Sequence, residues 1–334
     1  MKRAIYIVLA WMAVLTACER EIPYKGEYQD PKLVIQTELS EGGKTVNCGV
    51  TRSAFFLDQP FGEPIWYPSQ GVVLTVEREN GEKISMSDTV LTPNNHVFHV
   101  PLATPLQAGE TVTVRASHPD YPEVYGSDRV VPRPDVGMVS CVWDSAYDRC
   151  RVRLKFGENA DFDGVIGVKA TLDYNMVTTM RNGEIRDIPY YSSYIVSTDI
   201  AFMGLDNANS SEEGFNSFSE LFIKSTEVRN KEVEFYIQAT NRSTPPSAIA
   251  DPQEVRMSII SHSSDSYLYW RSIYNYFGAM GTSDYDFSSM VSDMFGVEEV
   301  VQIYSNVHDG YGAVLGTSKK SITFTFKDNR TQSW

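Results

Sequence analysis

The sequence predicts a mainly β protein with two immunoglobulin-like, β-sandwich-type domains and one short helix in the C-terminal region. Runs of β-branched and aromatic residues alternate with polar residues along most of the chain, and turn signals separate these runs. Aromatic residues make up 12% of the sequence, with 19 Tyr and 16 Phe, which favours strands. A length of 334 residues is sufficient for two domains of about 100 to 200 residues each.

Residues 1–17 have the pattern of a lipoprotein signal peptide. Lys2 and Arg3 give a positive start, and the apolar run of residues 4–14 is too short to span a bilayer. Residues 15–18 form a lipobox that ends at Cys18, the residue that we expect to be acylated and to begin the mature chain. An ordinary secretory peptide that happens to contain a cysteine is the alternative. The sequence therefore predicts a protein that is anchored in a membrane by lipid and does not span it.

Residues 18–31 are predicted to be an acidic tether between the lipid and the folded part. They are polar, interrupted by proline and without hydrophobic periodicity. Glu19 and Glu21 follow Cys18 directly and match, loosely, a signal for export to the cell surface. A solvated linker with incidental charge explains them as well.

Residues 32–134 are predicted to form the first sandwich. Seven β-type runs occur there, at residues 33–39, 46–54, 72–78, 83–89, 97–100, 110–118 and 124–131. Asn80-Gly81 predicts a type I′ hairpin turn between the third and fourth runs. Pro132 and Pro134 cannot lie within a central strand, so we place the domain boundary after residue 134.

Residues 135–334 are predicted to form a second β-rich domain. Its runs lie at residues 139–142, 150–156, 165–172, 232–240, 254–261, 302–304, 313–315 and 321–327. Asn182-Gly183 predicts a long hairpin with arms rich in Tyr, Val, Ile and Thr. The segment Ser264-Asp265-Ser266 offers an N-cap for a helix near 267–277, closed by Gly278. The aromatic residues of this helix repeat on one face, which is typical of a packing surface: Tyr267, Trp270, Tyr274 and Phe277.

The cysteines other than Cys18 are odd in number. Cys141 and Cys150 flank a predicted turn, and residues equidistant from a turn face each other across two strands. We therefore expect a cross-strand disulfide between them, with Cys48 as a buried free thiol. Two reduced core cysteines are the alternative.

Composition and motifs argue against several function classes. The net charge of −14 repels phosphate backbones, so nucleic acid is not an expected partner. The sequence contains no nucleophile elbow, no dinucleotide-binding or phosphate-binding glycine motif, and no His or Cys spacing that predicts a metal site. Residues 159–164 begin like a calcium loop, but Ala170 occupies the position where a glutamate ligand is required. We expect no cofactor, no metal and no catalytic residues.

Five segments carry a resemblance to a known family. They are Cys18, residues 31–35, residues 218–222 with the strand 232–237, residues 263–272, and residues 303–316 with an Asn-x-x-x-Gly-x-Gly turn. Together they resemble the Bacteroidota family of domain of unknown function 4249, predicted lipoproteins that are often encoded beside TonB-dependent outer-membrane receptors. The hairpin around Asn182 is longer than this resemblance implies.

The resemblance implies an outer-membrane lipoprotein, on the cell surface, that is an accessory or ligand-capturing partner of a TonB-dependent transporter. Its ligand, a small molecule or a peptide, is not specified by the sequence. A structural or adhesive surface protein, or a hydrolase without a recognisable motif, are the alternatives.

Partner contacts are expected in aromatic loops. Trp66 and Tyr67 lie in a proline-bracketed loop of the first domain, and Tyr190, Tyr191 and Tyr194 lie after the long hairpin turn. The alternative is that most of these rings cover the core.

Overall fold

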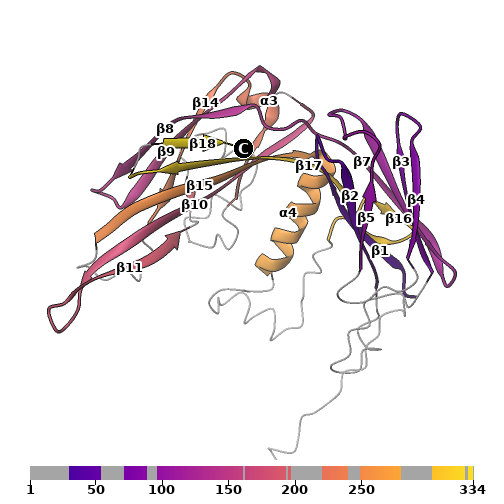
Figure 1. Ribbon diagram of the computed structural model, residues 1–334, viewed down its shortest axis with the longest axis horizontal. Helices are drawn as coiled ribbons and strands as arrows, with labels where there is room; N and C mark the ends of the chain where they lie inside the picture. Colours follow the sequence, from indigo (N-terminus) through magenta and orange to yellow (C-terminus); the bar gives the residue numbers. More distant parts are fainter. Residues whose placement is uncertain are drawn as a thin grey trace, which may run out of the picture.

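The computed structural model describes residues 30–53, 71–88, 96–160, 162–192, 195–196, 220–239, 249–279, 303–327 and 330–333. Within this part of the chain the secondary structure is mainly β, and the strands form two sandwiches (Figure 1). The predicted fold class is therefore confirmed.

The first sandwich packs two sheets against each other. One sheet contains β17 (Tyr311–Thr325), β1 (Leu33–Leu39), β2 (Thr45–Arg52) and β5 (Val97–Pro101), in that order. The other contains β16 (Val307–His308), β7 (Tyr121–Arg129), β6 (Thr111–His118), β3 (Val72–Arg78) and β4 (Lys83–Asp88). Alternate residues of β1, including Leu33, Ile35 and Leu39, are fully buried between the sheets. Every second side chain is buried, so the alternation of apolar and polar residues in the sequence determines which face of each strand packs into the core.

The second sandwich is built around two long strands. β10 (Gly164–Thr179) and β15 (Ile249–Ser263) pair with each other, and they are flanked by β11 (Ile185–Ser192), β13 (Glu220–Lys224), β17 and β18 (Arg330–Ser333). The facing sheet has the order β12 (Ile195–Val196), β14 (Glu232–Gln238), β9 (Arg149–Phe156) and β8 (Val136–Asp144). Phe156, Phe235 and Leu172 are among the fully buried side chains of the core between them.

Strand β17 belongs to both sandwiches. Its first part pairs in parallel with β1, from Tyr311 opposite Val34 to Gly316 opposite Leu39. Its second part, from Thr317 to Thr325, pairs antiparallel with β15. The first sandwich thus includes the C-terminal residues 307–316, which the predicted division after residue 134 assigned to the second domain. A single continuous strand joins the two halves of the molecule (Figure 1).

Helix α4 (Ser264–Ala279) covers the point where β17 passes from one sandwich to the other (Figure 1). Tyr269 of the helix packs on Ala313 and Leu315, while Val314, on the opposite face of the strand, lies in the first core. Because both faces of β17 are covered, residues 313–318 are all buried. The predicted helix at 267–277 lies within α4. Two further short elements were not predicted, a 3-10 turn (Glu158–Ala160) and α3 (Ser225–Val228).

The cap of α4 is also the junction between the sandwiches. The Ser263 hydroxyl accepts the Ser266 N–H at 3.0 Å, so Ser263 caps the helix and not a residue of the predicted segment 264–266. The same hydroxyl donates to the buried carboxylate of Asp128 on β7, which also accepts the Gly316 N–H at 2.6 Å. Burial raises the pKa of Asp128, and these hydrogen bonds lower it in part. One carboxylate therefore links β7, β17 and α4.

The Asn-x-x-x-Gly-x-Gly motif shapes the entry into β17. The Asn306 amide donates to the Val314 carbonyl at 2.7 Å and accepts the Val314 N–H at 3.0 Å, in the manner of a strand partner. Gly312 has φ +98°, and a Cβ there would collide with the Ile35 carbonyl oxygen. Glycine is required because the backbone of β17 approaches β1 this closely.

The two Asn-Gly hairpins are confirmed, but the predicted turn type at Asn80-Gly81 is wrong. Among these turn residues only Gly81 and Gly183 have positive φ, at 89° and 81°. The Gly81 N–H donates to the Arg78 carbonyl, and the Arg78 N–H donates to Glu82, which defines a three-residue loop with a bulged glycine. The Asn80 side chain accepts the Glu82 N–H at 2.9 Å, a local bond that replaces the left-handed conformation of a type I′ turn.

The three described cysteines occupy two different cores. Cys141 and Cys150 have sulfur atoms 3.1 Å apart and are held as thiols, so the disulfide stays a prediction. They are diagonal neighbours and not directly opposite, because the register pairs Cys141 with Val152 and Cys150 with Trp143. Cys48 is fully buried in the first sandwich, and burial raises its pKa to about 12.

The glycine motif generates a test of the shared strand. We expect Gly312→Ala to lower the free energy of unfolding by about 3 kcal/mol or more, because backbone strain and a backbone collision act together. Gly81→Ala is the matched control, since Gly81 has a similar φ but open space around its Cα. It should cost only about 1 to 2 kcal/mol. Urea unfolding of both variants measures the difference, and equal losses would contradict the role given to Gly312.

The cysteine geometry generates a second test. Peptide mapping without reductant should find Cys141 joined to Cys150, and native alkylation should leave Cys48 unmodified because its thiol is buried and neutral.

The raised pKa of Cys48 also predicts a pH dependence of stability. A thiol with an ordinary pKa of 9.0 when unfolded and about 12 when folded stabilises the folded state below pH 9. This contribution is lost as the pH rises toward 12, so the pH slope of stability should be smaller in Cys48→Ala. In the peptide map, a disulfide between Cys48 and either of the other two cysteines would contradict the assignment of Cys48 as a free thiol.

Candidate partner-binding site

The β10–β11 hairpin projects from one end of the second sandwich (Figure 1). β10 has 16 residues, and its distal part, residues 172–179, pairs with β11. Most residues of β11 are exposed, including Ile185 at 69%. β10 also pairs with β15 as far as Val177, so β11 is an edge strand of the sheet and only the hairpin tip, residues 178–186, extends beyond it into solvent. We call the β10–β11 hairpin the arm.

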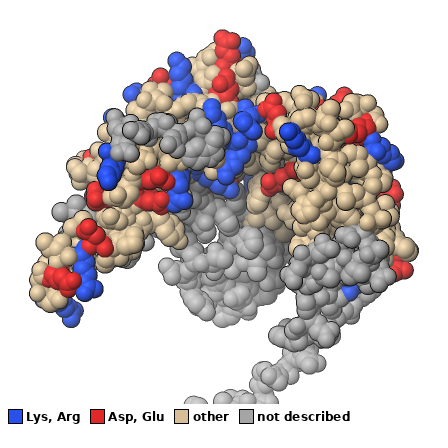
Figure 2. Space-filling view, viewed as in Figure 1, with Lys and Arg blue, Asp and Glu red and all other residues tan. Residues whose placement is uncertain are grey.

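The tip of the arm carries charges of both signs (Figure 2). Arg186 and Glu184 form an ion pair of 3.0 Å, and Arg181 and Asp187 are exposed beside them. The Arg186 pair is the largest cause of a lowered pKa at Glu184. Such an exposed pair contributes little to stability, so the tip is free to serve recognition.

The hairpin turn sets which residues face each other at the base of the arm. The Met180 N–H donates to Glu184 at 2.7 Å, and this register places Tyr190 opposite Tyr174 and Tyr191 opposite Asp173. Consecutive residues of a strand point to opposite faces. Tyr190 and Tyr191 therefore belong to different surfaces.

The two predicted tyrosines differ in environment. Tyr190 stacks on Tyr174 with ring centroids 6.0 Å apart and is 49% exposed. Tyr191 is 75% exposed on the other face. Tyr174 is buried, and this burial is the main cause of its raised pKa. The charge of an ionised Tyr190 is the second cause. Tyr191 thus presents the most accessible ring, while Tyr190 also serves packing.

An open pocket of about 370 Å³ lies beside Tyr191. Residues 173–175 of β10, residues 189–191 of β11 and Gln253 of β15 line it. A register shift of β10 against β15 between Asp173 and Tyr174 brings Gln253 to its edge. The pocket is thus a product of the bulge and of the hairpin register.

The carboxylate that lines the pocket is ion-paired. The Asp173 carboxylate pairs with Arg256 at 2.7 Å, and this pair raises the pKa of Arg256. Gln253 donates its amide to Asp251 at 2.9 Å. The lining thus combines ring surfaces with amides and a paired carboxylate, a combination that suits recognition more than proton transfer.

A second polar group resembles catalytic machinery but is closed. Ser266, His262 and Glu220 form a chain, with Ser266 Oγ 3.0 Å from His262 Nδ1 and His262 Nε2 3.3 Å from Glu220 Oε1. Lys169 pairs with Glu220 at 3.0 Å. Ser266 has no exposed surface, so no substrate can reach its hydroxyl while this packing holds. The chain links α4 to β13 and β15.

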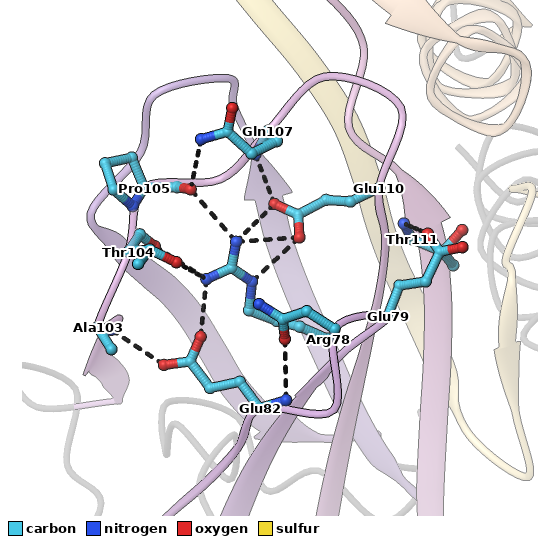
Figure 3. Close-up of polar contacts among 10 residues, drawn as sticks. Arg78, Glu79, Glu82, Ala103, Thr104, Pro105, Gln107, Glu110 and Thr111 are labelled. Atoms are coloured by element: carbon cyan, nitrogen blue, oxygen red, sulfur yellow. Dashed lines mark hydrogen bonds and ion pairs between the residues drawn. The ribbon is translucent and has the colours of Figure 1, made fainter.

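Arg78 is the centre of a buried ionic cluster at one end of the first sandwich (Figure 3). Its side chain is 2% exposed, and its guanidinium donates to Glu110 at 2.9 Å and Glu82 at 2.7 Å. It also donates to the Thr104 and Pro105 carbonyls. Glu110 is the main cause of a raised Arg78 pKa. Because every guanidinium nitrogen already has a partner, the cluster ties two loops together and has no donor left for a ligand.

Several predicted residues lie outside the described part of the chain: Cys18, Trp66, Tyr67 and Tyr194. Of the predicted contact residues, Tyr190 and Tyr191 are described, and both are exposed large side chains. Sequence reasoning missed Asp173, Asn175 and Gln253. Asp173 and Asn175 could have been identified from the sequence, because counting outward from the Asn182-Gly183 turn pairs them with Tyr191 and Pro189. Gln253 reaches the pocket through a β-bulge, and no sequence pattern predicts that bulge.

The described residues also bear on metal binding and on membrane spanning. In this part of the chain no group of three or more His, Cys, Asp or Glu side chains is placed to hold a metal ion. No helix within it is both long enough and apolar enough to cross a membrane.

Comparison with known proteins gives one family match. The model of a domain of unknown function, DUF4249, matches residues 19–323. No curated protein matches the chain. A two-domain fibronectin type-III segment of chicken tenascin is 11% identical, with 70% of this chain and 91% of that chain covered and a TM-score of 0.20. The BSP domain of a biofilm associated protein is 10% identical, with 70% of this chain and 27% of that chain covered and a TM-score of 0.22.

Proposed function

The chain belongs to the DUF4249 family, and from this premise we propose that it is a non-enzymatic surface lipoprotein that assists a TonB-dependent outer-membrane transporter. In this proposal Cys18 carries the lipid, the two sandwiches form the frame, and the β10–β11 arm contacts the transporter or its ligand.

The exposed arm is the observation that carries the proposal. Tyr191 is 75% exposed and Ile185 is 69% exposed on β11, the strand at one edge of a nine-stranded sheet. Tyrosine supplies contact area at a low entropy cost, so two large exposed side chains on one strand are suited to contact a partner. These residues support a recognition surface.

The position of the lipidated residue is compatible with this role. Fourteen residues lie between Cys18 and Leu33, the first residue of β1. Such a chain spans at most about 50 Å when fully extended. The folded part can thus reach a membrane-embedded partner from its own anchor, which raises the local concentration of the two proteins.

The chemistry of the arm favours binding over turnover. The carboxylate in the pocket is paired with Arg256, and the described serine that contacts a histidine is fully buried. A hydrolase would require an accessible nucleophile beside its base. The binding function is therefore the better supported of the two classes.

We expect Cys18→Ser to abolish lipid labelling and to release the protein from membranes, because the acyl chains supply the anchoring free energy. Membrane fractionation with metabolic fatty-acid labelling measures both effects. Continued fractionation of the variant with membranes would defeat the lipoprotein assignment.

We expect the wild-type protein to recover a transporter barrel in near-stoichiometric amounts from detergent-solubilised outer membranes. Tyr191→Ala should reduce this recovery severalfold and leave the thermal midpoint nearly unchanged, since the ring is 75% exposed. Tyr147→Ala is the matched control, because Tyr147 is 64% exposed and lies on the turn between β8 and β9, in the facing sheet.

Either of two results would contradict the proposal. Recovery of no barrel, while other transporter complexes stay intact, would favour the adhesive alternative. A large drop in the thermal midpoint of Tyr191→Ala would assign the ring to the core.

A further inference from the structure

The pocket beside Tyr191 has an apolar wall made by two rings. Tyr191 and Pro189 are two residues apart on β11, so their side chains share one face, and both line the pocket. Both residues are exposed. A flat ring in this position offers its π-face to C–H groups of a ligand.

The opposite side of the pocket offers unused hydrogen-bonding groups. Asn175 lies directly opposite Pro189 in the register. Among the described residues the Asn175 side-chain amide and Gln253 Oε1 have no hydrogen-bond partner, because Gln253 uses only its NH₂ group, toward Asp251. Two donors and two acceptors are thus available beside an apolar wall.

The carboxylate that lines the pocket is ion-paired, and two further carboxylates lie around the pocket, with Glu254 3.5 Å from Arg256 and Asp251 2.9 Å from the Gln253 amide. Asp173 is opposite Tyr191, and its carboxylate is neutralised by Arg256, which contacts both of its oxygens at 2.7 and 2.9 Å. An ionic ligand would have to compete with this pair or remain unpaired. The surrounding carboxylates repel an anion, and the carboxylate in the lining is already paired, so the lining favours a neutral ligand with many hydroxyl groups.

The size of the pocket limits the ligand. Its volume of about 370 Å³ lies near the lower end of the usual range for ligand pockets, about 300 to 1,000 Å³. This is enough for one hexose ring. Because the pocket is open to solvent, a longer chain can continue beyond it.

The edge of β11 is poorly suited to an added peptide strand. The Met180–Glu184 hydrogen bond sets the register, so that Ile185, Asp187, Pro189 and Tyr191 direct their main-chain groups away from β10. Pro189 has no N–H and so removes a donor from the middle of this edge. A peptide that binds by strand addition would lose a main-chain bond there.

We propose that this pocket binds one ring of a neutral saccharide. The Tyr191 ring stacks against the C–H face of the sugar, and Asn175 and Gln253 bind its hydroxyl groups. This inference rests on the proposed ligand-capturing function and names its ligand class.

The test uses the full chain, purified in a detergent without a sugar headgroup. Saturation-transfer NMR with methyl β-D-glucopyranoside, methyl β-D-galactopyranoside and N-acetylglucosamine should show transfer to the ring protons of at least one of them. Tyr191→Ala should weaken this binding by about tenfold or more, which corresponds to about 1.4 kcal/mol. Tyr191→Phe should retain it, Asn175→Ala should weaken it, and the control Tyr147→Ala should leave it unchanged.

Three results would overturn the inference. They are no transfer to any of the three sugars, equal binding in Tyr191→Ala, and Tyr191-dependent binding of a decaproline peptide in place of the sugars. The saccharide site and the proposed function can fail separately. If Tyr191→Ala loses transporter recovery but the wild-type protein binds no sugar, only the saccharide site is contradicted. If the protein binds a sugar but recovers no transporter, only the accessory role is contradicted.

Discussion

The structure depends on one strand that two sandwiches share. β17 completes a sheet of the first sandwich beside β1 and then continues into the sheet of the second beside β15. A strand of this kind must approach its neighbours closely on every side, which explains Gly312 against Ile35 and Gly316 against Arg129. The buried Asp128 carboxylate then joins this strand to β7 and to the cap of α4. Removal of any of these contacts would loosen both halves of the molecule.

The shared strand also explains what the sequence could and could not predict. Alternation in β1 and β6 is local, so the strands and the mainly β class follow from the residues themselves. The parallel pairing of β1 with β17 joins residues almost 280 positions apart, and no local pattern specifies such a partner. Residues 313–318 are buried on both faces and so lack the alternation that marks a half-buried strand. The sequence therefore predicted a strand in this region but not its place in the first sandwich.

The same distinction applies to the candidate site, where some features arise within one hairpin and others require a strand that is distant in the sequence. The Asn182-Gly183 turn and the exposed Tyr191 could be predicted from the sequence, because turn chemistry and ring exposure are properties of a single hairpin. Gln253 comes from another strand and reaches the pocket through a bulge. The ion pairing of the carboxylate in the pocket also required the structure, because the Asp173–Arg256 pair crosses from β10 to β15. Both features arise from the β10–β15 pairing, and β15 is in turn held by β17.

The central claim is that β17 makes the two sandwiches one cooperative unit. Native-state hydrogen exchange with mass spectrometry tests it most directly, by comparing residues 313–316, beside β1, with residues 317–325, beside β15. Our account predicts that both segments exchange with the same opening free energy and the same denaturant dependence, equal to those of global unfolding. Separate openings, with one segment exchanging well before the other, would show two independent domains and contradict it.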